Sequence, residues 1–164
     1  MSINGGKMNK EKTGRVLDYF EELFPNAYCE LNHETDFQLL VAVMLSAQTT
    51  DKKVNQLTET LFKKYPTVEA VSQASISELE QDIKTIGLYR NKAKNLLAMS
   101  KVLIEEFNGK VPSVQKELES LPGVGRKTAN VVRSVAFDIP AFAVDTHVER
   151  ISKRLGFAKK EDSV

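Results

Sequence analysis

Residues 121–130 read Leu-Pro-Gly-Val-Gly-Arg-Lys-Thr-Ala-Asn and lie between two segments of helical periodicity. Two glycines separated by one residue allow a tight turn, because glycine lets the backbone come very close to whatever lies above it. The N–H groups of Gly123, of Gly125 and of the helix that follows would then point outward, which suits a phosphate. The glycines alone leave an ordinary helix–helix turn open as the alternative, since Pro and Gly end many helices.

Apolar residues recur with helical spacing nearly everywhere outside this turn, and no segment alternates with a period of two. Residues 39–45 are apolar on all sides, so we expect a helix there at the centre of the core. The clearest helix spans residues 90–107 and ends at Asn108-Gly109. About nine short helices are expected in all, which predicts an all-α, bundle-like fold.

Capping signals mark several helix starts. Residues 35–38 and 75–78 each have the pattern of a capping box, in which the first side chain and the fourth bond each other's backbone N–H. Ser113 and Asp145 are expected to cap two later helices, and residues 126–137 form another. An apolar stripe at Val16, Leu17, Phe20, Leu23 and Phe24 predicts a first helix that needs a partner surface.

Composition excludes several classes of protein. The chain has 164 residues, 23 Lys and Arg against 22 Asp and Glu, and one cysteine, Cys29. That cysteine forms no internal disulfide and cannot alone hold zinc or an iron–sulfur cluster, so we expect no metal site. The longest apolar run, residues 39–45, is far shorter than the ~20 residues of a membrane span, and the polar start lacks a secretory signal. We therefore expect a cytoplasmic protein with no membrane contact.

Charge is unevenly distributed on a chain of net charge +1. Residues 122–160 carry 8 basic and 3 acidic side chains, and residues 84–101 carry 5 basic side chains and no acidic one. Two solvated helix faces are the commoner explanation of such runs, and a polyanion partner such as nucleic acid is the other.

Four motifs together resemble one family. Residues 121–129, followed by Ala-Val-Asp-Thr-His-Val at 143–148, are similar to the helix-hairpin-helix and catalytic aspartate of the endonuclease III family of DNA glycosylases. Leu-Ser-Ala-Gln-Thr-Thr-Asp at 45–51 and Ile-Gly-Leu-Tyr-Arg-Asn-Lys-Ala at 86–93 resemble two further family segments, in the family's order. The resemblance implies an all-α helix-hairpin-helix fold, with a six-helix domain at residues 29–139. Residues 1–28 and 140–164 would form an incomplete second domain.

The resemblance also implies a chemistry. Lys127 would attack C1′ of the damaged nucleotide, expel the base and form a Schiff base, after which β-elimination cleaves the strand. Asp145 would activate Lys127 or stabilise positive charge on the sugar, a role compatible with capping a helix. Relatives that only hydrolyse the glycosidic bond lack this lysine, so a bifunctional glycosylase and AP lyase is expected.

DNA contacts are implied for two further side chains and for the hairpin. Gln48 would fill the gap left by the extruded nucleotide, and Leu88 would wedge the opposite strand. The residues themselves leave plainer roles open: Gln48 as a hydrogen-bonding residue at a helix end, Leu88 as a loop residue packed on the core. The hairpin contacts would come from Gly123, Val124, Gly125, Arg126 and Thr128.

The sequence departs from the family at its end. Members usually continue for several tens of residues to four closely spaced cysteines that hold a 4Fe-4S cluster, whereas this sequence ends at Val164 with none of them. We therefore expect no cofactor in this chain, the cluster belonging only to a full-length family member. The roles of Cys29 and His33 stay open.

The expected function is base-excision repair of damaged, oxidised pyrimidines in double-stranded DNA, by a monomer that also cleaves abasic sites and, in a bacterium, lies with the nucleoid. A DNA-binding fragment that keeps the hairpin without catalysis is a second interpretation. A helical scaffold whose hairpin binds a protein is a third.

Overall fold

A computed structural model describes residues 10–159, in which nine α-helices and no strands are found. The all-α prediction is confirmed. The chain divides into two units, one of residues 29–143 and one made of residues 1–28 with 144–164. No helix in the described range is long and apolar enough to cross a membrane. That residues 29–139 form the six-helix domain of the family stays a prediction.

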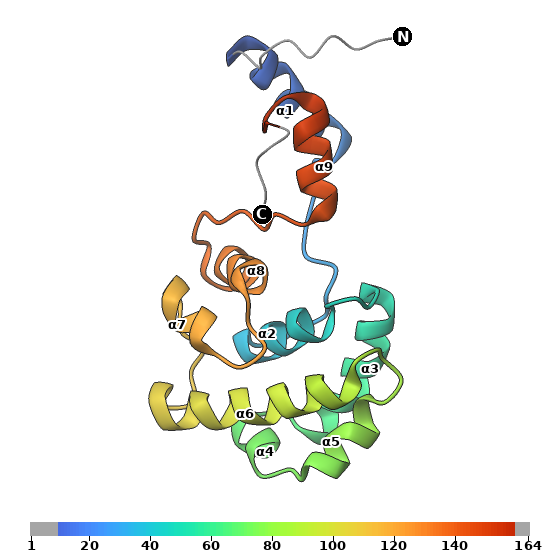
Figure 1. The fold of residues 1–164 in the computed structure, drawn as a ribbon, viewed down its shortest axis with the longest axis vertical. Coiled ribbons are helices and arrows are strands. Elements are labelled where there is room, and N and C mark those ends of the chain that lie inside the picture. The colour runs from blue at the N-terminus through green and yellow to red at the C-terminus, as the bar shows by residue number, and fades with distance from the viewer. Residues whose placement is uncertain (1–9, 160–164) are drawn as a thin grey trace. The chain divides into compact units, whose positions relative to one another are not determined.

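Helix α2 (Asp36–Leu45) is the centre of the larger unit, because every residue from Phe37 to Leu45 is buried. It packs against α3 (Asp51–Lys64), α6 (Tyr89–Phe107) and α8 (Arg126–Phe137). In Figure 1, α6 lies between α2 on one side and α4 (Val68–Ser72) with α5 (Ile76–Ile83) on the other. A helix that is apolar on all sides requires such a cover, so the central position follows from residues 39–45.

Helix α6 ends as its sequence indicates. Asn108 adopts a left-handed conformation with φ +53°, and Gly109 follows with φ +74°. The N–H of Gly109 donates to the carbonyl of Leu103 at 2.8 Å, which satisfies one of the carbonyls at the helix end.

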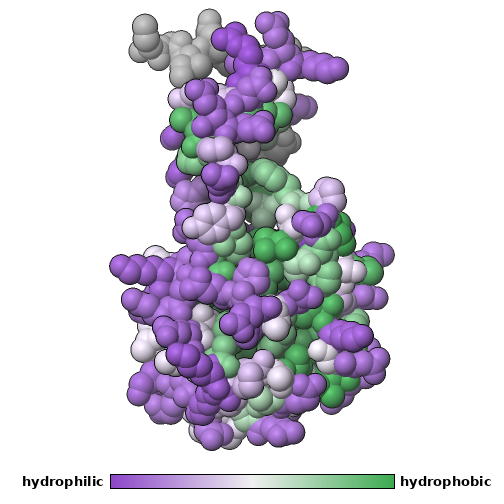
Figure 2. Space-filling view, turned by 180° about the vertical axis from the view of Figure 1, so that it is seen from behind, coloured by the Kyte–Doolittle hydropathy of each residue, from purple (hydrophilic) through white to green (hydrophobic). Residues whose placement is uncertain are grey.

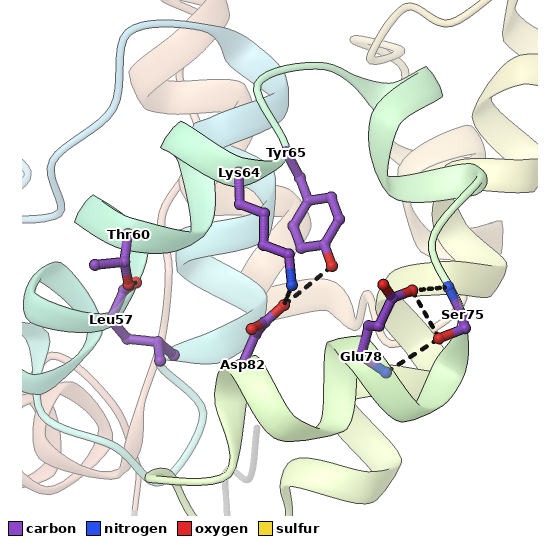
Figure 3. Close-up of polar contacts among 7 residues, drawn as sticks. All are labelled: Leu57, Thr60, Lys64, Tyr65, Ser75, Glu78 and Asp82. Carbon is purple, nitrogen blue, oxygen red and sulfur yellow. Dashed lines mark hydrogen bonds and ion pairs between the residues drawn. The ribbon is translucent and has the colours of Figure 1, made fainter.

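Polar contacts join α3 to α5 (Figure 3). Asp82 accepts hydrogen bonds from Lys64 Nζ at 2.7 Å and from the Tyr65 hydroxyl at 3.0 Å. The carboxylate of Asp82 raises the pKa of Lys64, and burial raises the pKa of Tyr65. The capping box of α5 is complete, because Ser75 Oγ accepts from the N–H of Glu78 and Glu78 Oε2 accepts from the N–H of Ser75.

Two predicted caps differ in detail. Thr35 accepts from the N–H of Gln38 as expected, but Gln38 Oε1 accepts from the N–H of Glu34, one residue before the cap. Helix α7 (Gln115–Ser120) is capped by Val114 rather than Ser113. The carbonyl of Ser113 instead accepts from Arg133 Nε at 3.2 Å, which ties this residue to α8.

Helices α7 and α8 pack against each other on either side of the turn at residues 121–125. Their buried faces and the turn join the core through side chains that are at most 6% exposed: Leu118, Leu121, Val124, Ala129 and Val132. Figure 2 shows hydrophilic side chains over much of the surface of this unit, with apolar groups reaching the surface between them. Because Leu121 and Val124 are buried, the turn packs against the core.

The smaller unit contributes α1 (Lys10–Leu23) and α9 (Thr146–Leu155), neither of which has a buried residue. The expected apolar stripe lies on α1 and on Phe24, the residue that follows it, and most of its side chains are exposed, Leu17 by 55% and Phe24 by 63%. Asp145 caps α9 as predicted, and Gly156 ends it in a left-handed conformation.

Candidate nucleic-acid interface

The hairpin turn is held against α6 at Gly123. This residue has φ +80°, a conformation that favours glycine. A Cβ at this position would lie 2.8 Å from the Cβ of Asn95 on α6. The next N–H, that of Val124, donates to the carbonyl of Leu121 at 3.1 Å. Both the conformation and the space at residue 123 therefore demand glycine.

Gly125 has a different role. Its φ of −98° is open to any residue, and a Cβ built there would meet nothing within 4 Å. It is the N-cap of α8 and brings no side-chain oxygen to the first turn of that helix. The helix N-terminus therefore carries its positive dipole end to an open surface, which favours an anion.

The hairpin residues with side chains fall into two groups. Val124 is 6% exposed and its N–H is bonded within the turn, so its side chain packs on the core, and a DNA contact by this residue stays a prediction. Arg126 is exposed, with Nε 4.0 Å from Glu119 Oε1. Lys127 is exposed and Thr128 is half-buried, both in the first turn of α8.

Asp145 belongs to the smaller unit, where its carboxylate is fixed by the helix it caps. Oδ1 accepts from the N–H of His147 at 3.0 Å and from the N–H of Val148 at 2.8 Å. His147 Nδ1 lies 3.4 Å from the second oxygen, Oδ2. The two backbone bonds orient one oxygen, so the group has a defined position within its own unit.

Gln48 is exposed at the turn that follows α2. The N–H of Thr49 donates to the carbonyl of Ser46 at 3.0 Å, and Gln48 is the third residue of this turn. Its φ is +56°, in the left-handed region that glycine or asparagine usually occupies at such a position. A role as a hydrogen-bonding residue at the helix end fits the position of Gln48 after α2. That role does not explain why a glutamine is kept in a left-handed conformation.

Leu88 lies at the start of α6 and is also strained. It is the N-cap residue with φ +57°, and its side chain is 59% exposed. A leucine packed on the core would be largely covered, so that alternative does not describe this side chain.

Four non-glycine residues have positive φ within the described part of the chain: Gln48, Leu88, Asn108 and Asp138. Asn108 and Asp138 are helix C-caps, and their side-chain types tolerate the left-handed region. The other two do not share that tolerance. Strain of this kind, about 1–3 kcal/mol a residue, is typical of functional sites, and here it falls on the two side chains for which DNA insertion was expected.

Sequence reasoning missed Lys92. The run at residues 84–101 suggested an outward basic face, but the Lys92 side chain is only 6% exposed, and the Nζ atom bonds residues on both sides of Gln48. A signal was present, because Lys92 lies four residues before Leu96, on the buried face of α6.

His33 and Cys29 take local roles: His33 Nδ1 lies 2.8 Å from the carbonyl of Leu31, and Cys29 packs half-buried against the core. In the described range, no three His, Cys, Asp or Glu side chains are grouped so that they could hold a metal ion. With a single cysteine in the sequence, the residues present do not fit an iron–sulfur cluster.

The chain is similar to known DNA repair proteins in sequence. Residues 41–164 match the model of the family described as HhH-GPD superfamily base excision DNA repair protein. Endonuclease III of Bacillus subtilis is 57% identical over 157 residues, which are 96% of this chain and 72% of that protein. Endonuclease III of Escherichia coli is 46% identical over 151 residues, 92% of this chain and 72% of that protein.

Solved structures are also similar. A non-covalent endonuclease III–DNA complex has a TM-score of 0.91 at 54% identity, over 95% of this chain and 73% of that one. A trapped endonuclease III–DNA covalent intermediate, an estranged-adenine complex, has a TM-score of 0.92 at 55% identity over the same shares. A thermostable thymine-DNA glycosylase has a TM-score of 0.81 at 27% identity, over 87% of this chain and 67% of that one.

Proposed function

This chain belongs to the endonuclease III family within the HhH-GPD superfamily of base excision DNA repair proteins, and we propose that Lys127 makes it a bifunctional DNA glycosylase and AP lyase. The observation that carries the proposal is the place of Lys127, exposed in the first turn of α8 directly after the open N-cap Gly125. An amine there lies beside a helix end that favours phosphate, so it can meet a sugar whose flanking phosphate is bound.

The proposed reaction begins with the unprotonated Lys127 amine. Its lone pair forms a bond to C1′ of the damaged nucleotide, and the glycosidic bond breaks with its electron pair leaving on the base. The lysine nitrogen gives up one proton as the departing base takes one up. Its lone pair then breaks the C1′–O4′ bond, O4′ is protonated, and an iminium forms between Nζ and C1′. Loss of a proton from C2′ drives cleavage of the C3′–O bond, which breaks the strand 3′ to the lesion, and water finally releases the lysine.

Asp145 is proposed to support this chemistry by its charge. Positive charge develops on the sugar as the base leaves, and a carboxylate held by two backbone N–H groups needs no reorganisation to stabilise it. Asn caps helices as well as Asp does, so Asp145→Asn removes the charge and keeps the cap. We expect this variant to unfold like the parent protein and to excise bases far more slowly.

The hairpin is proposed to bind the DNA backbone through the N-terminus of α8, with Gly123 shaping the turn and Gly125, Arg126 and Thr128 facing phosphate. Such contacts position a protein on the duplex and carry no sequence information. Binding through them should weaken as salt rises, because phosphate contacts release counterions.

Base extrusion is the proposed role of the two strained residues. Taking a nucleotide out of the stack costs a few kcal/mol, and side chains that fill the gap offset part of that cost. Gln48 would occupy the space left by the extruded nucleotide, and Leu88 would separate the bases of the opposite strand. Their backbone conformation and exposure support this assignment.

The proposed substrate is duplex DNA with an oxidised pyrimidine or an abasic site, and the proposed form is a monomer. The proposed location is the cytoplasm and, if the source is a bacterium, the nucleoid within it.

Borohydride trapping tests the nucleophile directly. A duplex with one abasic site should give a covalent adduct with the parent protein and with Lys116→Gln, a variant of an exposed lysine on α7. Lys127→Gln should give no adduct while it still binds the duplex. An undiminished adduct from Lys127→Gln would assign the nucleophile elsewhere, and duplex binding by the parent protein with no adduct or cleavage would identify a non-catalytic DNA-binding protein.

A further inference from the structure

Lys92 projects from α6 into the core of the larger unit, where an ammonium group is expensive to bury. Its Nζ lies 2.8 Å from the carbonyl oxygen of Leu45, 2.7 Å from that of Ala47 and 3.0 Å from Thr49 Oγ1. An ammonium has three N–H donors, so each donor has one acceptor. Burial lowers the pKa of Lys92, while all three of these oxygens accept from Nζ, an arrangement that suits the protonated form.

The three acceptors surround the turn at Gln48. Leu45 is the last residue of α2, and Ala47 and Thr49 are the neighbours of Gln48 on either side. The Thr49 hydroxyl also lies 3.4 Å from the carbonyl of Ala47, so the two neighbours are joined to each other as well as to Lys92. The residues flanking the strained Gln48 are thus held by one side chain from another helix.

The backbone of Lys92 makes a second connection. Its N–H donates to the carbonyl of Leu88 at 3.0 Å, the hydrogen bond that closes the first turn of α6 after the other strained residue. One residue therefore bonds the carbonyl group of Leu88 through its backbone and the turn at Gln48 through its side chain.

We propose that Lys92 is a positioning residue that holds Gln48 in its left-handed conformation and keeps it at a fixed place relative to Leu88, so that both side chains enter the duplex together. This inference rests on the proposed function, because it gives Lys92 a role in base extrusion. Lys92 is proposed to act through Gln48 and not on the reacting atoms.

Loss of Lys92 should affect base excision and abasic-site cleavage unequally. A turn that is already ordered adds no ordering entropy to base extrusion, whereas a turn that must be ordered at each encounter makes extrusion less favourable. An intact damaged base must be unstacked before excision, while an abasic site has no base to unstack. Loss of Lys92 should therefore slow base excision more than it slows cleavage of a preformed abasic site.

The experiment compares two rates in each protein: excision from a duplex with one thymine glycol, and strand cleavage of the same duplex with one abasic site. Lys92→Met removes the ammonium at similar length, and Thr49→Val removes one acceptor at a partly exposed position. Lys92→Arg retains charge and donors. Lys101→Met is the control, because it removes the same charge from an exposed position further along α6.

We expect Lys92→Met to lower the ratio of excision to abasic cleavage by about tenfold or more, since a hydrogen bond to a charged group is worth roughly that factor. Thr49→Val should lower the ratio by a smaller factor and remains informative if Lys92→Met does not fold. Lys92→Arg should restore part of the ratio, and Lys101→Met should leave it unchanged.

An equal fall of both rates in the folded variants would mean that Lys92 is merely structural, and an unchanged ratio in Lys92→Met or in Thr49→Val would overturn the inference. A parent protein that performs neither reaction would instead contradict the proposed function.

Discussion

The hairpin at Gly123 and the turns at Gln48 and Leu88 place a similar backbone conformation on very different residues. The φ angles are +80°, +56° and +57°, all in the left-handed region. At the hairpin this conformation falls on glycine, the residue that adopts it without strain. At the two turns it falls on long side chains, both exposed. The difference indicates that the hairpin acts through its backbone, whereas the turns keep strained side chains because those side chains are used.

Gly123→Ala should give the largest effect on stability. It adds strain of about 1–2 kcal/mol from the positive φ and an overpacking cost of about 1–3 kcal/mol against Asn95. We expect a loss of roughly 2–5 kcal/mol in the free energy of unfolding, measured with urea. Gly125→Ala is the matched control, and it should lose at most about 1 kcal/mol, because only the quality of the N-cap changes. Equal losses would mean that the two glycines have the same role.

Leu88→Gly is the reverse substitution, because it places glycine at a left-handed position that now has a side chain. The left-handed strain disappears, and a side chain that is 59% exposed takes little packing with it, so stability should hold. Burial of a leucine side chain between bases is worth about 1.5–3 kcal/mol, which corresponds to a fall of roughly 10- to 100-fold in the rate of base excision. Single-turnover excision measures this. A rate within twofold of the parent protein would make Leu88 a passive loop residue.

Gly125→Asn tests the backbone role of the hairpin with a smaller effect. Asparagine is a strong N-cap residue whose side-chain oxygen accepts from the amides of the first turn, so α8 should become slightly more stable. The same bond takes those amides away from phosphate, and we expect affinity for damaged and undamaged duplex to fall alike, by about three- to tenfold. Fluorescence anisotropy at fixed salt measures this. Unchanged affinity would remove the helix N-terminus from the DNA contacts.

Much of the fold could be predicted from the sequence, because periodicity and punctuation report directly on local structure. Residues 126–137 form a helix with the predicted bounds, and α6 begins one residue before the expected Arg90. Ser113 was predicted as a cap, but Val114 is the N-cap of α7, and the carbonyl of Ser113 accepts a tertiary hydrogen bond from Arg133. Local patterns contain no information about such a partner.

Only part of the candidate site could be predicted from the sequence. The glycines of the hairpin predict a turn on physical grounds, but nothing in the residue types of Gln48 and Leu88 predicts a left-handed backbone, since both are poor in that region. Lys92 was grouped with exposed basic residues because lysines are almost never fully buried unless paired. The carbonyl groups that pair with it come from a turn more than forty residues away, and only the fold brings them together.

Gln48 keeps a strained backbone because its side chain is used, and Gln48→Gly separates the two when the free energy of unfolding and the excision rate are measured on the same protein. Relief of strain should leave the free energy of unfolding unchanged or raise it by up to about 1 kcal/mol, while excision of thymine glycol falls about tenfold or more and binding to undamaged duplex holds. Asn108→Gly, at the left-handed end of α6, should change neither stability nor excision appreciably. Excision by Gln48→Gly at the parent rate would mean that the strain at Gln48 serves no step of the reaction, and that its side chain is not needed for base extrusion.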